Sequence, residues 1–214
     1  MEVFYMQTPV GMIHCCQWLP EGKPVGIVQI IHGISEYIGR YAPLAKFLSS
    51  KGWLVVGEDH PGHGHSVGED DQFGYLTGGW SGTVKLIHQL YTKTRREYPG
   101  IPYVMLGHSM GSFLLRTYLF TYHSDLSGVM LSGTAWLPDG ILPAGQLVCK
   151  AEAVRLGAQA HSPLIHSIMF GGYNKSFESV RTPYDWISSD PKWWMPIQQI
   201  ASAPGSLLSS CARK

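Results

Sequence analysis

The 214-residue chain is poor in charge and in cysteine. Charged residues make up 14% of it, against roughly 25% in typical soluble domains, and the 16 basic and 15 acidic side chains nearly cancel. The densest basic run is Lys93–Arg96, so the basic stripe of a nucleic-acid-binding protein is missing and we expect no nucleic-acid partner. No CxxC pair occurs among the four cysteines, which argues against a disulfide framework or a zinc site: Cys15, Cys16, Cys149 and Cys211.

Long apolar runs are also missing. No stretch reaches the length that spans a bilayer, and residues 1–20 lack a positive segment followed by an apolar block. We therefore expect neither a membrane span nor a signal peptide, and a cytoplasmic protein with reduced thiols. The chain does contain 44% apolar and 12% aromatic residues, enough for the core of about one domain.

Short apolar runs alternate with helical segments in the first part of the chain. Two strands are predicted over residues 3–7 and 12–18. Four apolar runs, typical of parallel strands covered on both faces, follow at residues 26–31, 53–57, 103–107 and 129–132. Helical spacing predicts helices over residues 41–48, from 84 to just before Pro99, and over 112–122, the last apolar nearly all round and therefore buried. The order predicts an α/β fold with right-handed crossovers.

The alternation stops after Ser132, which divides the chain into three predicted segments. Residues 1–135 form the α/β core. Residues 136–190 are helix-prone but interrupted by prolines, which indicates a cap inserted over the carboxyl edge of the sheet. Residues 191–214 contain no acidic residue and no clean period, and we expect an atypical tail.

The pentapeptide Gly107-His108-Ser109-Met110-Gly111 lies between a predicted strand and a predicted helix. In that context G-x-S-x-G is typical of a nucleophile elbow, a tight turn that exposes the serine hydroxyl. The two glycines leave room where backbones meet, and the helix N-terminus presents free N–H groups to developing negative charge. We predict Ser109 as a nucleophile and the Met110 N–H as an oxyanion donor, with a chance match as the alternative.

The segment His32-Gly33-Ile34 directly follows the run at residues 26–31. In this architecture the loop after that strand supplies a second oxyanion donor, so we expect the Ile34 N–H to pair with that of Met110. The alternative is that His32 and Gly33 only turn the chain.

Three histidines fall within six residues: His60, His63 and His65. They suggest a metal site, but their spacing matches no familiar ligand motif. Gly62 and Gly64 favour a tight loop whose polar side chains satisfy buried backbone groups. We therefore expect no metal and no cofactor, and keep a metalloprotein as an alternative.

Three stretches together resemble the landmark motifs of one branch of the α/β-hydrolase fold, the monoacylglycerol lipases and lysophospholipases, which includes enzymes labelled serine aminopeptidase-like. They are HGISEYIGRY (32–41), EDHPGHGHSVG (58–68) and LGHSMGSFLLRTYL (106–119). The resemblance covers residues 1–190, with Pro61 where Arg is common, Tyr37 where His is common, and residues 173–186 similar to the family's cap. It implies a mostly parallel sheet with helices on both faces, a helical cap, Ser109 as nucleophile, and Ile34 and Met110 as oxyanion donors.

A serine nucleophile needs a general base and an orienting carboxylate, which this fold carries in the order serine, acid, histidine. The family has both beyond the cap, whereas the last histidine here is His166. His108 neighbours Ser109 and should point to the opposite face; Glu152 and His161 have the right order but lie in the cap. We therefore expect this chain to lack the acid, the base and the last strands. Either the chain is truncated or frame-shifted near residue 190, or a short protein uses an unexpected base or is non-catalytic.

The resemblance implies hydrolysis of carboxylic esters. Apolar cap residues would suit an acyl chain and a transient contact with a membrane surface, which favours monoacylglycerol or lysophospholipid substrates; most of them could equally pack the cap on the core: Ile141, Leu142, Leu147, Val148, Leu164, Ile165, Ile168, Met169 and Phe170. The alternatives are a peptidase or amidase with the same machinery, and a catalytically impaired fragment or binding protein. We expect weak activity and a tendency to aggregate, because the sheet would keep an open edge.

Overall fold

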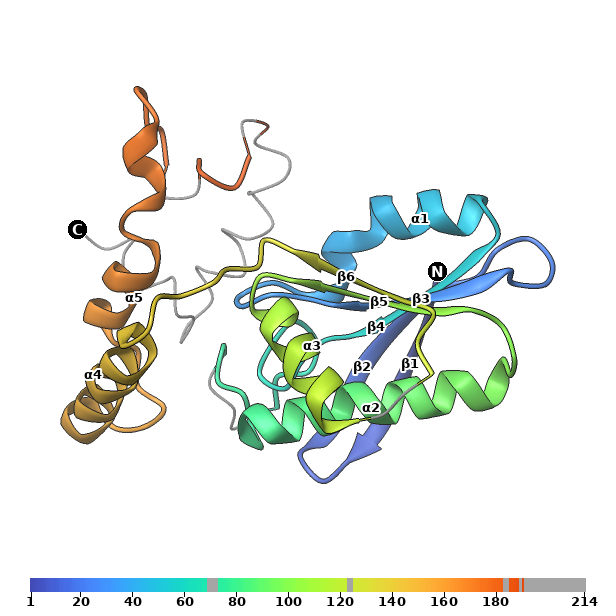
Figure 1. The fold of residues 1–214 in the computed structure, drawn as a ribbon, viewed down its shortest axis with the longest axis horizontal. Helices are drawn as coiled ribbons and strands as arrows, with labels where there is room; N and C mark the ends of the chain where they lie inside the picture. The colour runs from blue at the N-terminus through green and yellow to red at the C-terminus, as the bar shows by residue number, and fades with distance from the viewer. Residues whose placement is uncertain (69–72, 123–124, 183–184, 189, 191–214) are drawn as a thin grey trace. The chain divides into compact units, whose positions relative to one another are not determined.

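A computed structural model describes residues 1–68, 73–122, 125–182, 185–188 and 190 (Figure 1). The chain divides into two units, Met1–Thr134 and Ala135–Lys214, and each is described by itself. The predicted tail, residues 191–214, lies outside the described residues, as do residues 183–184 of the cap motif.

The first unit is built on a six-stranded sheet. Its strands are β1 (Glu2–Thr8), β2 (Gly11–Trp18), β3 (Gly26–Ile31), β4 (Trp53–Glu58), β5 (Tyr103–His108) and β6 (Gly128–Ser132), in the spatial order β1-β2-β4-β3-β5-β6. The pairs β1–β2 and β2–β4 are antiparallel, and β3, β4, β5 and β6 run parallel. The six strands predicted from the sequence are confirmed to within one residue at each end, and with them the mostly parallel α/β fold.

Helices cover both faces of this sheet. They are α1 (Ala42–Ser50), α2 (Gly79–Glu97) and α3 (Met110–Thr121). A 3₁₀ turn, η1 (Ile38–Tyr41), directly precedes α1. Figure 1 shows α1 on one face and α2 with α3 on the other. Alternate residues of β4 feed the two cores: Leu54 and Val56 join the cluster under α2 and α3, and Val55 joins the cluster under α1.

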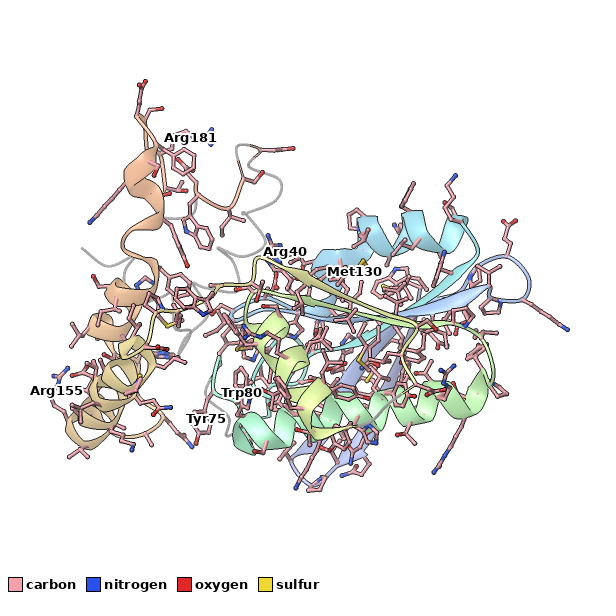
Figure 2. All side chains as sticks on the ribbon, viewed as in Figure 1. Arg40, Tyr75, Trp80, Met130, Arg155 and Arg181 are labelled. Atoms are coloured by element: carbon pink, nitrogen blue, oxygen red, sulfur yellow. The ribbon has the colours of Figure 1, made fainter. Side chains whose placement is uncertain are left out.

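Two predictions of burial are wrong. Helix α3 is not buried all round, since Phe120 is 88% exposed and only one face, which includes Leu114 and Leu115, is buried. Strand β6 is not covered on both faces, because Met130, which is labelled in Figure 2, is 43% exposed and its neighbours Val129 and Leu131 are also exposed. Within the described sheet β6 is one of the two edge strands and pairs with β5. The apolar pattern of a strand shows which side chains it could bury, but it does not show whether other segments pack against them.

The second unit contains α4 (Ile141–Leu156), α5 (Pro163–Phe170) and a 3₁₀ turn, η2 (Tyr173–Ser176). Ser162 caps α5 by accepting from Ile165 N at 3.1 Å, and its hydroxyl donates to the carboxylate of Glu152 on α4. Arg155 also binds Glu152, at 2.8 Å. In the described part of the chain no helix is long and apolar enough to cross a membrane.

Candidate active site

A single residue, Ser109, makes the turn between β5 and α3. Its backbone lies at φ 51° and ψ −119°, a region that serine rarely adopts and that costs about 1–3 kcal/mol. Two bonds hold it there: Ser109 N donates to Ser132 O on β6, and Ser112 N donates to Ser109 O, both at 2.9 Å. Ser109 is only partly buried, so the strained turn presents its side chain at the carboxyl end of β5.

The two glycines of the pentapeptide lie where backbones meet. A Cβ on Gly111 would lie 2.1 Å from Ile31 O, and a Cβ on Gly107 would lie 2.5 Å from Gly111 O. Both distances are far shorter than any contact that real side chains make. The start of α3 therefore packs directly on the end of β3, which no larger residue would allow.

The loop after β3 passes beside the turn. A Cβ on Gly33 would lie 3.1 Å from Ser109 Cβ and 3.2 Å from His108 O. The peptide that joins Gly33 to Ile34 is therefore next to Ser109, and Met110 opens α3, where an N–H has no intrahelical acceptor. The structure thus places Gly33 beside Ser109, and the residues that follow these two in the chain, Ile34 and Met110, carry the two N–H groups that the sequence predicts as donors.

The ring of His32 is fully buried beneath this loop. Its Nε2 accepts from His60 N at 2.9 Å, and its Nδ1 lies 2.7 Å from Gly33 O. Because a backbone N–H can only donate, the ring proton is on Nδ1, which donates to Gly33 O. Burial, reinforced by the nearby His60 and His63, holds the pKa of His32 well below its usual value, so the ring is neutral.

The other histidines of the predicted loop bind backbone or acidic groups. His60 Nε2 lies 3.0 Å from His32 O and its Nδ1 lies 3.3 Å from Glu58; His63 Nδ1 lies 3.1 Å from Pro61 O. Burial lowers the pKa of His63 to about 4. Among the residues that the structure describes, no group of three or more His, Cys, Asp or Glu side chains could hold a metal ion.

Sequence reasoning assigned no role to two buried carboxylates near the site. Glu36, 3% exposed, accepts from Gly33 N and from Arg40, and from Tyr41 OH at 2.7 Å. Asp59 accepts from Ile38 N at 2.7 Å and lies 2.9 Å from His14 Nδ1, among other contacts. The four-residue spacing of Glu36 and Arg40 is the one signal in the sequence that could have indicated the first.

Of the residues considered as base or acid, His108 lies in the same unit as Ser109, and Glu152 and His161 belong to the second unit. His108 Nδ1 lies 3.1 Å from Ser132 Oγ, and among the described residues of the first unit no hydrogen bond joins the Ser109 hydroxyl to a histidine ring. In the second unit, the hydrogen bonds of Arg155 and Ser162 lower the pKa of Glu152 to about 2. The acid and the base stay predictions.

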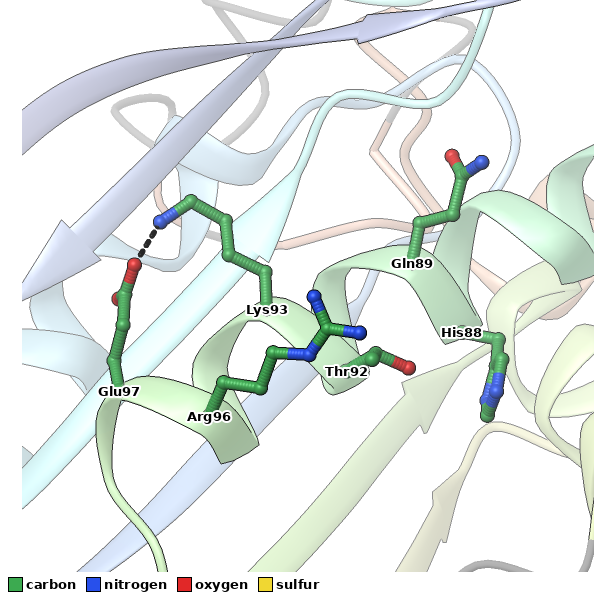
Figure 3. A pocket seen from close by; sticks show the side chains of 6 residues that line it. All are labelled: His88, Gln89, Thr92, Lys93, Arg96 and Glu97. Atoms are coloured by element: carbon green, nitrogen blue, oxygen red, sulfur yellow. Dashed lines mark hydrogen bonds and ion pairs between the residues drawn. The ribbon is translucent and has the colours of Figure 1, made fainter.

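A pocket on α2 lies elsewhere. Its lining comes entirely from the second half of that helix (Figure 3): His88, Gln89, Thr92, Lys93, Arg96 and Glu97. This end of α2 leads into the start of β5, whereas Ser109 follows the end of β5. The pocket is therefore separate from the candidate site.

Comparison with known proteins identifies the family and the fold. Residues 22–193 match the family described as "Serine aminopeptidase, S33". The chain belongs to this family. A solved carboxyl esterase of Bacillus coagulans, in complex with glycerol, superposes on 98% of this chain and 69% of its own, with a TM-score of 0.76 and 28% identity. The fold is accordingly that of the α/β-hydrolases.

Two relatives with curated names are described as a monoglyceride lipase homolog and a monoacylglycerol lipase. A monoglyceride lipase homolog of Monkeypox virus is 42% identical over 103 residues, which are 47% of this chain and 35% of the viral protein. A monoacylglycerol lipase of Mycolicibacterium smegmatis is 34% identical over 134 residues, which are 62% of this chain and 46% of the bacterial one. The chain therefore spans between about a third and a half of the length of these two relatives.

Proposed function

We propose that the chain is a serine hydrolase of carboxylic esters, with Ser109 as the nucleophile. The observation that carries this proposal is the strained, positive-φ backbone of Ser109 at the junction of β5 and α3, with Gly33 against its side chain. A serine in such a conformation persists only where its surroundings over-determine it, and such strain gathers at functional sites.

The reaction follows from the groups around that turn. Ser109 Oγ attacks the carbonyl carbon of the ester, and the carbonyl electrons move to the oxygen, which the N–H groups of Ile34 and Met110 stabilise. The ester C–O bond breaks, and the Oγ proton passes through a general base to the departing alcohol. Water then attacks the acyl-enzyme in the same way, which releases the carboxylic acid and restores the hydroxyl.

No described residue is assigned as the general base or its carboxylate. Without them Ser109 stays a weak nucleophile, because the loss of a triad member costs several orders of magnitude in rate. We therefore expect slow turnover from this chain.

Monoacylglycerols or lysophospholipids are the proposed substrates. The two lipase relatives support an ester with a single acyl chain. Helices α4 and α5 carry side chains that are apolar yet exposed, which suits an acyl chain or a transient contact with a membrane surface: Ile141, Leu142, Leu147, Leu164, Ile168 and Met169.

A second candidate is an aminopeptidase or amidase, which the description of the matching family favours. The unmodified chain and Ser109→Ala should be assayed on short-chain and long-chain p-nitrophenyl esters and on aminoacyl amides. The proposal expects the unmodified chain to hydrolyse the esters faster than Ser109→Ala does. It also expects a higher rate on long-chain than on short-chain esters. Faster cleavage of the amides would favour the peptidase, and equal rates in both proteins would favour a non-catalytic binding role.

A further inference from the structure

We propose that Glu36 is a positioning residue which, with His32, sets the direction of the Ile34 N–H. The inference deepens the proposed function, on which it rests for the role of Ile34 as an oxyanion donor. It starts from the contacts of one residue, Gly33, whose N–H and C=O are each bound by a buried side chain.

The two contacts hold Gly33 from opposite ends. Gly33 N donates to Glu36 Oε1, and Gly33 O accepts from His32 Nδ1 at 2.7 Å. A trans peptide is planar, with its C=O and N–H pointing in opposite directions. Fixing the carbonyl of Gly33 therefore also fixes the N–H of Ile34, which belongs to the same peptide. Glu36 holds the preceding peptide, between His32 and Gly33, so the two bonds together restrain φ and ψ of Gly33, and glycine has the freest backbone of all residues.

The Glu36 carboxylate is itself fixed by several hydrogen-bond donors. It is 3% exposed and takes donors from the turn that follows it, Arg40 and Tyr41, besides Gly33. Burial, and then the Glu36 charge, raise the pKa of the Tyr41 phenol far above its usual range, so this hydroxyl keeps its proton and donates. A carboxylate with this many donors has little freedom to move, and transmits that rigidity to Gly33.

Two substitutions separate positioning from a purely structural ion pair. Glu36→Gln removes the charge that pairs with Arg40 but keeps an oxygen that can accept from Gly33. Glu36→Leu removes both. A positioning role predicts that the glutamine variant retains most of the function and the leucine variant does not, whereas loss of an ion pair alone would affect both alike. Glu97→Gln is the matched control, because Glu97 forms an i,i+4 ion pair with Lys93 on the exposed face of α2.

The experiment measures the amide resonances of Gly33 and Ile34 in ¹⁵N-labelled protein, and the rate at which a fluorophosphonate probe labels Ser109. We expect Glu36→Leu to shift both resonances and to slow labelling by about 10- to 100-fold. Glu36→Gln should shift mainly Gly33 and slow labelling far less, and the control should change neither.

An unchanged Ile34 resonance in Glu36→Leu, or equal losses of labelling in both variants, would overturn the proposal. If the unmodified protein is not labelled at all, the proposed function fails, and the resonances still decide the role of Glu36. If Glu36→Leu does not fold, the Gly33 amide of the unmodified protein decides. Slow exchange with D₂O supports the buried bond to Glu36, and fast exchange refutes it.

Discussion

The rings of His32 and His60 lie with their centroids 3.9 Å apart, and the two residues are joined at two points. His60 N donates to His32 Nε2 at 2.9 Å, and His60 Nε2 lies 3.0 Å from His32 O. The loops that follow β3 and β4 are tied together by this pair. The tie requires a neutral His32, because a protonated ring would direct a second N–H at the N–H of His60.

The buried histidines of these two loops predict a loss of stability in mild acid. Burial lowers the pKa of both His32 and His63 in the folded protein, that of His63 to about 4. An unfolded histidine takes up its proton near pH 6.5, so below that pH the unfolded state binds more protons and is favoured. We expect the free energy of unfolding in urea to fall between about pH 7 and pH 5, with His63 contributing up to about 3 kcal/mol once the pH is below 4.

His63→Asn should reduce this pH dependence by the contribution of His63 and leave that of His32. A free energy of unfolding that stays constant or rises on acidification over the same interval would contradict the interpretation.

Substitution by alanine should have opposite effects at two glycines, of which only Gly111 lies at the contact between α3 and β3. Gly111→Ala would place its Cβ 2.1 Å from Ile31 O, and we expect a destabilisation of about 3 kcal/mol or more. Gly82→Ala in α2 meets nothing within 4 Å and should stabilise the protein by about 0.5–1 kcal/mol through helix propensity. Denaturant unfolding of both variants is the measurement, and similar values would show that the close approach is wrong.

The loop beside the nucleophile contains a second strained serine. Ser35 has φ 58°, is 5% exposed, and its hydroxyl makes no hydrogen bond in the described structure. Ser35→Gly removes both the strain and the unsatisfied group, so we expect a stabilisation of about 1 kcal/mol. Ser50→Gly, at the exposed end of α1, should not stabilise. A loss of stability in Ser35→Gly would mean that this hydroxyl has a partner in solution.

Exposed apolar side chains predict self-association of the chain. Met130 on β6 and Phe120 on α3 are 43% and 88% exposed, and β6 is an outer strand of the described sheet. We expect Met130→Lys and Phe120→Lys to raise the concentration at which light scattering first detects aggregates. Val25→Lys, at an isolated exposed position before β3, serves as control. The same onset in all variants would exclude these two side chains as the cause.

Most of the core could be predicted from the sequence because its signals are local. The apolar run before His108 and the helical run after Met110 each determine an element, and the pentapeptide between them determines the turn. Burial could not be predicted in the same way. Phe120 and Met130 have the residue types of a core, but their exposure depends on which other segments pack against them.

The support of the candidate site was missed for a different reason. The bond from Gly33 N to Glu36 and that from His60 N to His32 depend on how two loops fold back, which no periodicity reports. His60 and His63 contact backbone carbonyl groups, as expected from the glycines near them, which favour a tight turn over the spacing of metal ligands.

The central claim is that the turn at Ser109 presents a nucleophile. The most direct test is to incubate the purified chain with a fluorophosphonate and to locate the adduct by peptide mass spectrometry. The account predicts slow labelling that is confined to Ser109, and its complete loss in Ser109→Ala. An adduct on another residue, or labelling that survives in Ser109→Ala, would contradict it.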